Sequence, residues 1–268
     1  MAGSVSTAEQ NLRAGELSAC LVDLQTQVRR NPADTRARIF LAQLLMVLGE
    51  WDRALTQLNV IGEMDAGAIP MTRAYSAAIQ CERLRGAVLE GKRSPLIFGD
   101  PEPWLALVVQ GLTALAAGRA EQADAIRAEA FEAAPATAGS LNGQEFEWIA
   151  DADSRLGPIL EVLLNGAYYW IPFHRIATVE FEQPADLRDM VWLPAQFTWT
   201  NGGQAVGFIP TRYAGTESAT DPALQLSRKT EWTTIGTDAF AGLGQRVLAT
   251  SADEVPLLEV RELRLTGS

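Results

Sequence analysis

The amino-acid sequence predicts an α+β fold, in which a tetratricopeptide-like helical repeat domain precedes a smaller, mostly antiparallel β domain that also contains helix. Three observations predict it. Apolar residues in the first half recur at helical spacing, a glycine-containing segment recurs after 34 residues, and the second half alternates apolar and polar residues between turn signals. The stretch 144–172 separates these patterns, so we expect domains at 1–143 and 144–268.

Helical spacing covers most of the first half. Asn31-Pro32 and Gly49 supply stop signals between the early segments. The segment SPLIFGDPEP is rich in proline and predicts a loop rather than a helix. The predicted helices are Leu12–Val28, Ala33–Leu48, Trp51–Ile61 and Met71–Glu90, and a further helix begins near Trp104. The basic residues near the end of the fourth helix predict a solvated helix face, and they are Arg83, Arg85, Lys92 and Arg93.

The recurrence of Gly15–Leu21 at Gly49–Leu55 has the tetratricopeptide period. In such repeats a glycine forms the turn between paired helices, and small residues lie where the two backbones approach closely. Gly118 starts a third such unit. The small positions and closing prolines of the three units are Cys20, Pro32, Ala42, Ala54, Gly111, Ala123, Ala130 and Pro135. An irregular helical bundle with coincidental glycine spacing stays the alternative.

Arrays of paired helices bind peptides or helices in a groove lined by the first helix of each pair. Two segments of the sequence would supply those first helices, one on either side of the long fourth helix. For each apolar member the competing interpretation is packing within its own repeat. The candidate partner-binding residues are Arg36, Ile39, Gln43, Met46, Leu105, Val108, Leu112 and Leu115.

The stretch between the halves predicts a short helix. Asp153 or Ser154 can accept a hydrogen bond from the first free amides of a helix beginning at Leu156. Asn165-Gly166 then supplies residues that tolerate positive φ and would end that helix. An aromatic run, Tyr168–Trp170, follows directly.

The second half predicts a small antiparallel sheet, curled into a partial barrel, with one or two helices against it. Asn201-Gly202 lies between two alternating runs and is a strong hairpin signal. The predicted strands are Ile176–Glu182, Ala195–Thr200 and Gln204–Ile209, and Arg246–Thr250 and Leu257–Leu265 form a final pair. Residues Ala223–Lys229 predict a short helix.

Composition narrows the class of function. The net charge is −11, divided as −3 before residue 144 and −8 after it, which disfavours nucleic acid and anionic membranes as partners. Cys20 and Cys81 are isolated and predict buried thiols in a reducing compartment. No secretory signal or membrane-spanning apolar run is evident, so we expect a cytoplasmic protein.

No catalytic or cofactor motif stands out. Asp151, Asp153 and Glu161 resemble part of a calcium loop, but Leu156 and Val162 occupy the positions that need glycine and glutamate. No G-x-S-x-G or phosphate-binding loop occurs. We therefore expect no metal, no cofactor and no enzymatic activity. The alternative is a hydrolase or metal-dependent enzyme around Asp151, Asp153 and the single histidine His174, with Glu180 nearby.

Several long segments resemble the ImpE family, also called TagJ or SciE, which are accessory proteins of the bacterial type VI secretion system. The segments are QEFEWIADADSRLGPILEVLLNGAYYWIP, DLRDMVWLPA, FIPTRYAGTE and GLGQRVLAT, together with the loop PEPW. The resemblance implies a non-enzymatic cytoplasmic role, binding of the N-terminal helix of the sheath small subunit TssB, and a link to the ATPase ClpV. It assigns no catalytic residues. The oligomeric state stays open, and self-pairing through Tyr168–Trp170 is a third hypothesis.

Overall fold

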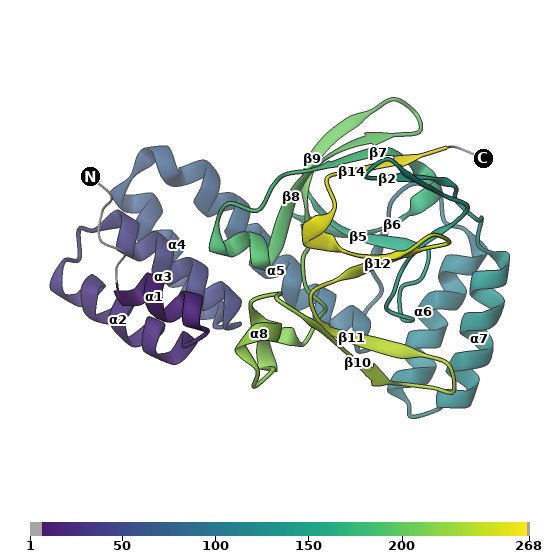
Figure 1. Cartoon of the computed structure of the whole chain (residues 1–268), viewed down its shortest axis with the longest axis horizontal. Coiled ribbons are helices and arrows are strands. Elements are labelled where there is room, and N and C mark those ends of the chain that lie inside the picture. Colours follow the sequence, from purple (N-terminus) through teal and green to yellow (C-terminus); the bar gives the residue numbers. More distant parts are fainter. Residues whose placement is uncertain (1–6, 267–268) are drawn as a thin grey trace.

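The computed structural model describes residues 7–266, and within that range its helices precede most of its strands (Figure 1). The predicted α+β class is confirmed. The helices are α1 (Thr7–Ala14), α2 (Leu17–Arg30), α3 (Thr35–Val47), α4 (Trp51–Met64), α5 (Ile69–Leu89), α6 (Pro103–Ala116), α7 (Ala120–Ala133) and α8 (Pro222–Gln225).

Three helical hairpins repeat one turn geometry. Gly15 joins α1 to α2, Gly49 joins α3 to α4, and Gly118 joins α6 to α7, with φ of 81°, 70° and 72°. In each turn the residue after the glycine donates its amide hydrogen to a carbonyl five residues earlier. This closure needs a left-handed residue, and glycine adopts that conformation without steric cost. The predicted glycine turns are therefore confirmed, and the predicted helix Leu12–Val28 is divided at Gly15.

Small side chains lie buried where the paired helices meet. Within each pair the helices pack directly against one another. Larger side chains would separate these backbones, so the pattern of small residues has the packing role that the repeat interpretation gave it. The buried small residues are Cys20, Ala42, Ala54, Gly111, Ala123 and Ala130.

The strands form one large sheet and two small ones. The large sheet has the order β1-β6-β5-β9-β8-β7-β14-β2-β3, the second pairs β10 with β11, and the third has the order β13-β12-β4. Among the strands of residues 7–266, only the β1–β6 pair is parallel. The strands are β1 (Leu96–Ile97), β2 (Gly139–Leu141), β3 (Gln144–Phe146), β4 (Ile149–Asp151), β5 (Ile159–Leu164), β6 (Ala167–Pro172), β7 (Ile176–Phe181), β8 (Trp192–Trp199), β9 (Gln204–Pro210), β10 (Thr230–Thr234), β11 (Phe240–Gly244), β12 (Val247–Thr250), β13 (Glu254–Pro256) and β14 (Glu262–Leu265).

The predicted helix after Asp153 is wrong. That segment is strand β5, and Asn165-Gly166, with φ of 50° and 79°, is the two-residue turn into β6. All six residues of β5 are buried, so their side chains show no alternation, and a short apolar run cannot be told from a buried helix by periodicity. The Asn-Gly pair carried the hairpin signal instead. Tyr168 and Trp170 on β6 are completely buried, so the predicted aromatic surface for self-pairing is also wrong.

The predicted pairing of the last two strands is wrong as well. The β12 strand pairs with β13 and β4, whereas β14 pairs with β7 and β2 in the large sheet. The turn after Thr250 leads into β13, and a short 3-10 turn, Leu257–Glu259, redirects the chain before β14. The β8–β9 hairpin at Asn201-Gly202 is confirmed.

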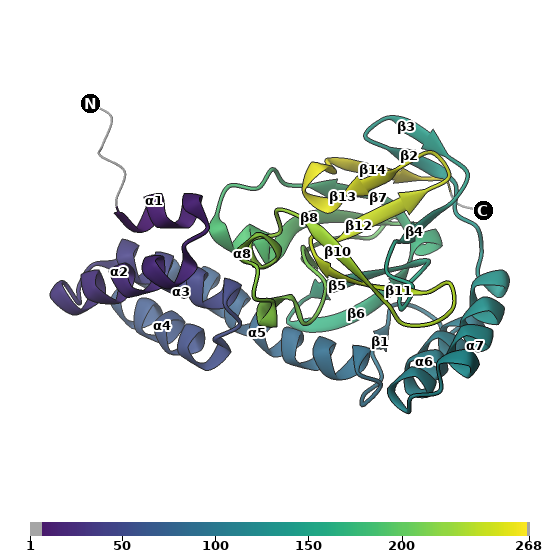
Figure 2. The same cartoon turned by 60° about the horizontal axis from the view of Figure 1, so that its bottom comes forward.

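Helix α5 follows the hairpin α3–α4 and runs beneath the sheet, where it packs on α4 and β6 (Figure 2). One hydrophobic core extends from α1 through α5 to Leu163, Trp170 and Trp192 of the sheet, and a second lies within the strand region. The residue pair 143/144 falls in the turn between β2 and β3. The division into domains 1–143 and 144–268 stays a prediction.

Candidate functional site

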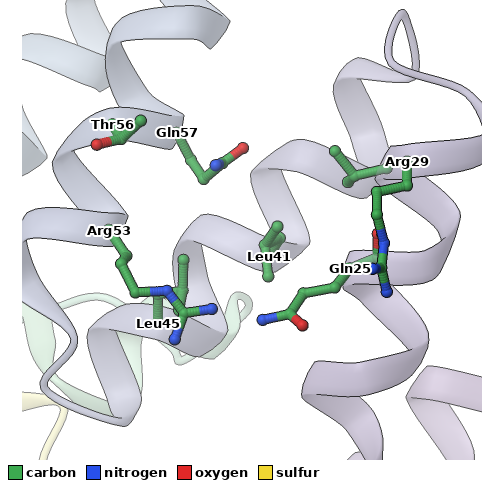
Figure 3. Close-up of a pocket in the computed structure, with 8 residues that line it drawn as sticks. Gln25, Arg29, Leu41, Leu45, Arg53, Thr56 and Gln57 are labelled. Atoms are coloured by element: carbon green, nitrogen blue, oxygen red, sulfur yellow. The ribbon is translucent and has the colours of Figure 1, made fainter.

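A groove opens between α2, α3 and α4, on the helical side of the molecule (Figure 3). Its volume is about 320 Å³. Its floor consists of the buried side chains Val28, Leu41 and Leu45. Polar side chains of α2 and α4 form its two rims, and they are Gln25, Arg29, Arg53, Thr56 and Gln57. An apolar floor between polar rims suits an amphipathic helix.

The local sequence explains the floor. The side chain of Asp34 accepts a hydrogen bond from the Ala37 amide at 3.0 Å and so caps the start of α3. Leu41 and Leu45 are four residues apart, so they project from one side of this helix. The tight turn at Gly49 then brings α4 back beside α3, and the rim residues of α4 face those of α2.

The rims carry positive charge in an otherwise acidic protein. Arg29 is exposed, and its Nε donates to the carbonyl oxygen of Gln25 at 3.2 Å. Among the described residues, the one ion-pair contact of Arg53 is with Glu50, 3.6 Å between nitrogen and oxygen, and its side chain is 46% exposed. Both guanidinium groups therefore keep donors available for carboxylates of a partner.

The predicted groove residues lie elsewhere. Those on α3 point to the side opposite Leu41 and Leu45, and Gln43 and Met46 are only 8% and 1% exposed. The η3 turn (Leu187–Met190) packs against α3. Arg36 is exposed and Ile39 is half-buried.

The predicted residues on α6 belong to a separate region. Leu105, Val108 and Leu112 are buried, and Leu115 is half-buried. The last three line a void of only about 20 Å³ together with Arg155 and Ile235 of the second half. Helices α3 and α6 lie at opposite ends of the molecule (Figures 1 and 2), so the eight residues do not share one surface. Their role in partner binding stays a prediction.

A buried ionic network joins α5 to the sheet. Arg85 donates from Nε and Nη2 to the two carboxylate oxygens of Glu161, both at 3.0 Å, and from Nη1 to Glu82 at 2.6 Å. Arg246 bridges Glu161 and Asp151 from the other side. All of these side chains are buried. The prediction of a solvated face is therefore wrong for Arg85, because the sheet covers that side of α5.

Burial and charge oppose each other in this network. Burial disfavours ionised Glu161, but Arg85 and Arg246 outweigh it and lower the pKa of this carboxyl to about 2. Burial raises the pKa of Asp151 to about 6, although Arg246 partly offsets it. Tyr168 donates its hydroxyl hydrogen to Glu161, and Trp192 donates to Glu82 at 2.9 Å. Hydrogen bonds thus satisfy the buried charges, as such networks require.

The residues of the predicted enzyme site do not form a common site. The side chain of Asp153 binds Arg155 and accepts from the Gly242 amide, whereas Asp151 binds Arg246 and Tyr213. His174 instead lies 3.0 Å from Glu102 of the PEPW loop. Helix capping by Asp153 or Ser154 is wrong, since a strand follows. Within residues 7–266, no cluster of three potential metal ligands occurs.

A model of the ImpE protein family matches residues 143–264. The type VI secretion system accessory component TagJ of Pseudomonas aeruginosa is 48% identical to this chain over 97% of it and 92% of the relative. The chain belongs to the ImpE family. A crystal structure of a Vibrio parahaemolyticus protein covers 98% of both chains with a TM-score of 0.89 at 22% identity, a likeness that shows the shared fold alone.

Sequence patterns missed the residues that connect the halves of this ImpE protein. Arg212 is 2% exposed and donates to the carbonyls of Val47 at 2.7 Å, Met46 at 3.2 Å and Gln225 at 2.8 Å. It thereby caps the C-terminal end of α3. A signal existed for Glu161, because it is the one charged residue within the apolar run of β5.

No helix among the described residues is both long and apolar enough to span a bilayer.

Proposed function

We propose that this ImpE protein is a non-enzymatic accessory component of a type VI secretion system that holds the N-terminal helix of the sheath small subunit TssB in the α2–α4 groove. The groove is the observation that carries the proposal. The type VI role is supported by the name of the 48% identical Pseudomonas aeruginosa relative. In this proposal the protein works in the cytoplasm and reaches ClpV through the sheath.

The groove sets what the bound helix must look like. Each large aliphatic side chain that the helix buries against Leu41 and Leu45 contributes about 2 kcal/mol. An exposed pair between a carboxylate and Arg29 or Arg53 contributes at most about 1 kcal/mol. The apolar stripe therefore determines affinity, and acidic residues beside it determine orientation and partner choice. We expect a helix with apolar residues at spacings of three and four and carboxylates at its edges.

The buried network disfavours the enzyme hypothesis. A catalytic carboxylate must reach substrate, yet Asp151 and Glu161 are buried and bound to arginines. Asp153 is likewise completely buried and bound to Arg155. The contacts of Glu161 with Arg85 and Arg246 instead join α5 to the sheet.

Binding of a fluorescent peptide tests the proposal. The peptide is the N-terminal helix of the TssB encoded with this protein, and the protein is the full chain. We expect a micromolar Kd for the wild type and at least about tenfold weaker binding for Arg29→Glu/Arg53→Glu, about 1.4 kcal/mol or more. Arg119→Glu, a charge reversal at the exposed turn before α7, is the control and should leave Kd within about twofold. Equal binding by the groove variant, or none by the wild type, would contradict the proposal.

A further inference from the structure

Strand β9 is longer than the strand beside it. It pairs with β8 along its whole length, from Trp192↔Pro210 to Thr198↔Gln204. On its other side, the described pairing with β5 is at Leu163↔Phe208. The β5 strand ends at Leu164 and turns back into β6, so β9 continues past it. The residues 204–206 therefore form a strand edge without a neighbour among the described strands, and the β8–β9 hairpin projects beyond the sheet (Figure 1).

The backbone groups of this edge point outward. The Trp199 amide donates to the Gly203 carbonyl, and at the other end of the hairpin the Thr211 amide donates to the Val191 carbonyl, both at 2.9 Å. Residues directly opposite in an antiparallel pair alternate between hydrogen-bonded and non-hydrogen-bonded. Odd-numbered residues of β9 therefore bond to β8, and even-numbered ones turn their N–H and C=O groups away from it. The backbone N–H and C=O groups of Phe208 point toward β5. Those of Gln204 and Val206 point the same way but lie beyond the end of β5.

An apolar cavity lies beside this edge. Its volume is about 310 Å³, and it lies between β9 and the helix α5. Ala74, Ala77 and Cys81 of α5 form one wall, and their small side chains leave the space open. On the other wall, Val206 is 68% exposed, whereas Phe208 on the same face packs on Tyr75 with ring centroids 5.2 Å apart.

We infer that this edge receives an extended segment of a partner protein, which joins the sheet as a strand beside residues 204–206 and places an apolar side chain in the α5 cavity. Strand addition obtains affinity from main-chain hydrogen bonds and specificity from pockets for alternate side chains. The outward N–H and C=O groups of residues 204–206 would supply the main-chain hydrogen bonds, and the α5 cavity would supply the pocket. Exposed edges are usually protected by lysine, proline or a bulge, but the edge sequence is Gln204-Ala205-Val206. The surface is separate from the α2–α4 groove and accepts a strand instead of a helix.

Substitutions of Val206 test the main-chain contact directly. Val206→Pro removes the outward N–H without removing a bond to β8, since proline is tolerated on edge strands. Val206→Ala keeps that N–H and is the matched control. The probe is a displayed library of random 12-residue peptides, selected on the full chain. Peptides enriched on the wild type should alternate apolar and polar residues. Their Kd should rise at least about tenfold with Val206→Pro and less than about threefold with Val206→Ala.

Hydrogen exchange supplies a readout that does not depend on the variants. Addition of the selected peptide to the wild type should slow exchange of the Gln204 and Val206 amides, while the Ala205 amide, already bonded to β8, should change little. Filling the cavity by Ala74→Leu should weaken the same peptides. The inference is overturned if no peptide is enriched, or if the enriched peptides bind Val206→Pro as tightly as wild type and leave both edge amides unchanged. Peptides with helical spacing whose binding is lost in Arg29→Glu/Arg53→Glu would also overturn it.

Discussion

The two sides of α3 differ in what covers them. The side that carries Leu41 and Leu45 forms the floor of a groove with exposed rims. The side that carries Gln43 and Met46 is packed within the chain, and Arg212 from the second half holds the carbonyl oxygens at the end of this helix. The repeat array alone would leave both sides free. The rest of the chain covers one side and leaves the other open.

The charged residues of the two regions also differ in burial. Buried charges join α5 to the sheet, and the groove rims bear exposed charges with weak partners. Breaking a buried pair leaves an uncompensated charge in a medium of low polarity, whereas an exposed charge stays solvated. Substitutions in the two regions should therefore separate effects on stability from effects on binding.

The largest expected effect is that of Glu161→Gln. The substitution leaves Arg85 and Arg246 without their shared carboxylate, and we expect the free energy of unfolding to fall by about 3–5 kcal/mol. Urea denaturation at pH 7 measures the change. Thr56→Ala on the groove rim is the control, and its effect should stay within about 0.5 kcal/mol. A loss below about 1 kcal/mol for Glu161→Gln would show that the network does not stabilise the joint.

The difference in unfolding free energy between wild type and Glu161→Gln should depend on pH, and the pKa of Glu161 fixes the sign of that dependence. The pKa of Glu161 is lowered in the folded state, so its contribution to stability is complete above the ordinary value of 4.5 and is lost as pH falls toward about 2. The stability difference between wild type and Glu161→Gln should thus shrink below pH 5, by about 3 kcal/mol over this window. A difference that stays constant from pH 6 to pH 3 would contradict this assignment.

A smaller effect is expected for Arg212→Met. The substitution keeps an apolar side chain of similar length but removes the donor to the buried Val47 carbonyl and to the partly buried Gln225 carbonyl. The Met46 carbonyl keeps the Gly49 amide as a donor. We expect a loss of about 2 kcal/mol. Hydrogen exchange should show faster opening of the last turn of α3, while α7 keeps its protection. An unchanged midpoint of unfolding together with unchanged exchange in α3 would remove Arg212 as the cap of this helix.

The sequence predicted the local structure of the first half well. The three turns could be predicted from Gly15, Gly49 and Gly118, because a residue with positive φ ends each first helix and glycine adopts that conformation most easily. The strand β5 was missed because a fully buried run has no alternating pattern. The candidate partner-binding residues on α3 were chosen by helical spacing, which gives the faces of a helix but not which face the distant residues near Arg212 cover. Their role stays a prediction. Long-range contacts of this kind leave no periodic signal.

Photo-crosslinking tests most directly which side of α3 receives the partner. A benzophenone amino acid is placed at Thr56 on the groove rim, and in separate proteins at Arg36 and Leu115 from the alternative set. Each full-length protein is irradiated with the N-terminal helix peptide of TssB. We expect a crosslinked product from Thr56 and none above background from the other two positions. Crosslinking at Arg36 or Leu115 with none at Thr56 would contradict binding in the α2–α4 groove.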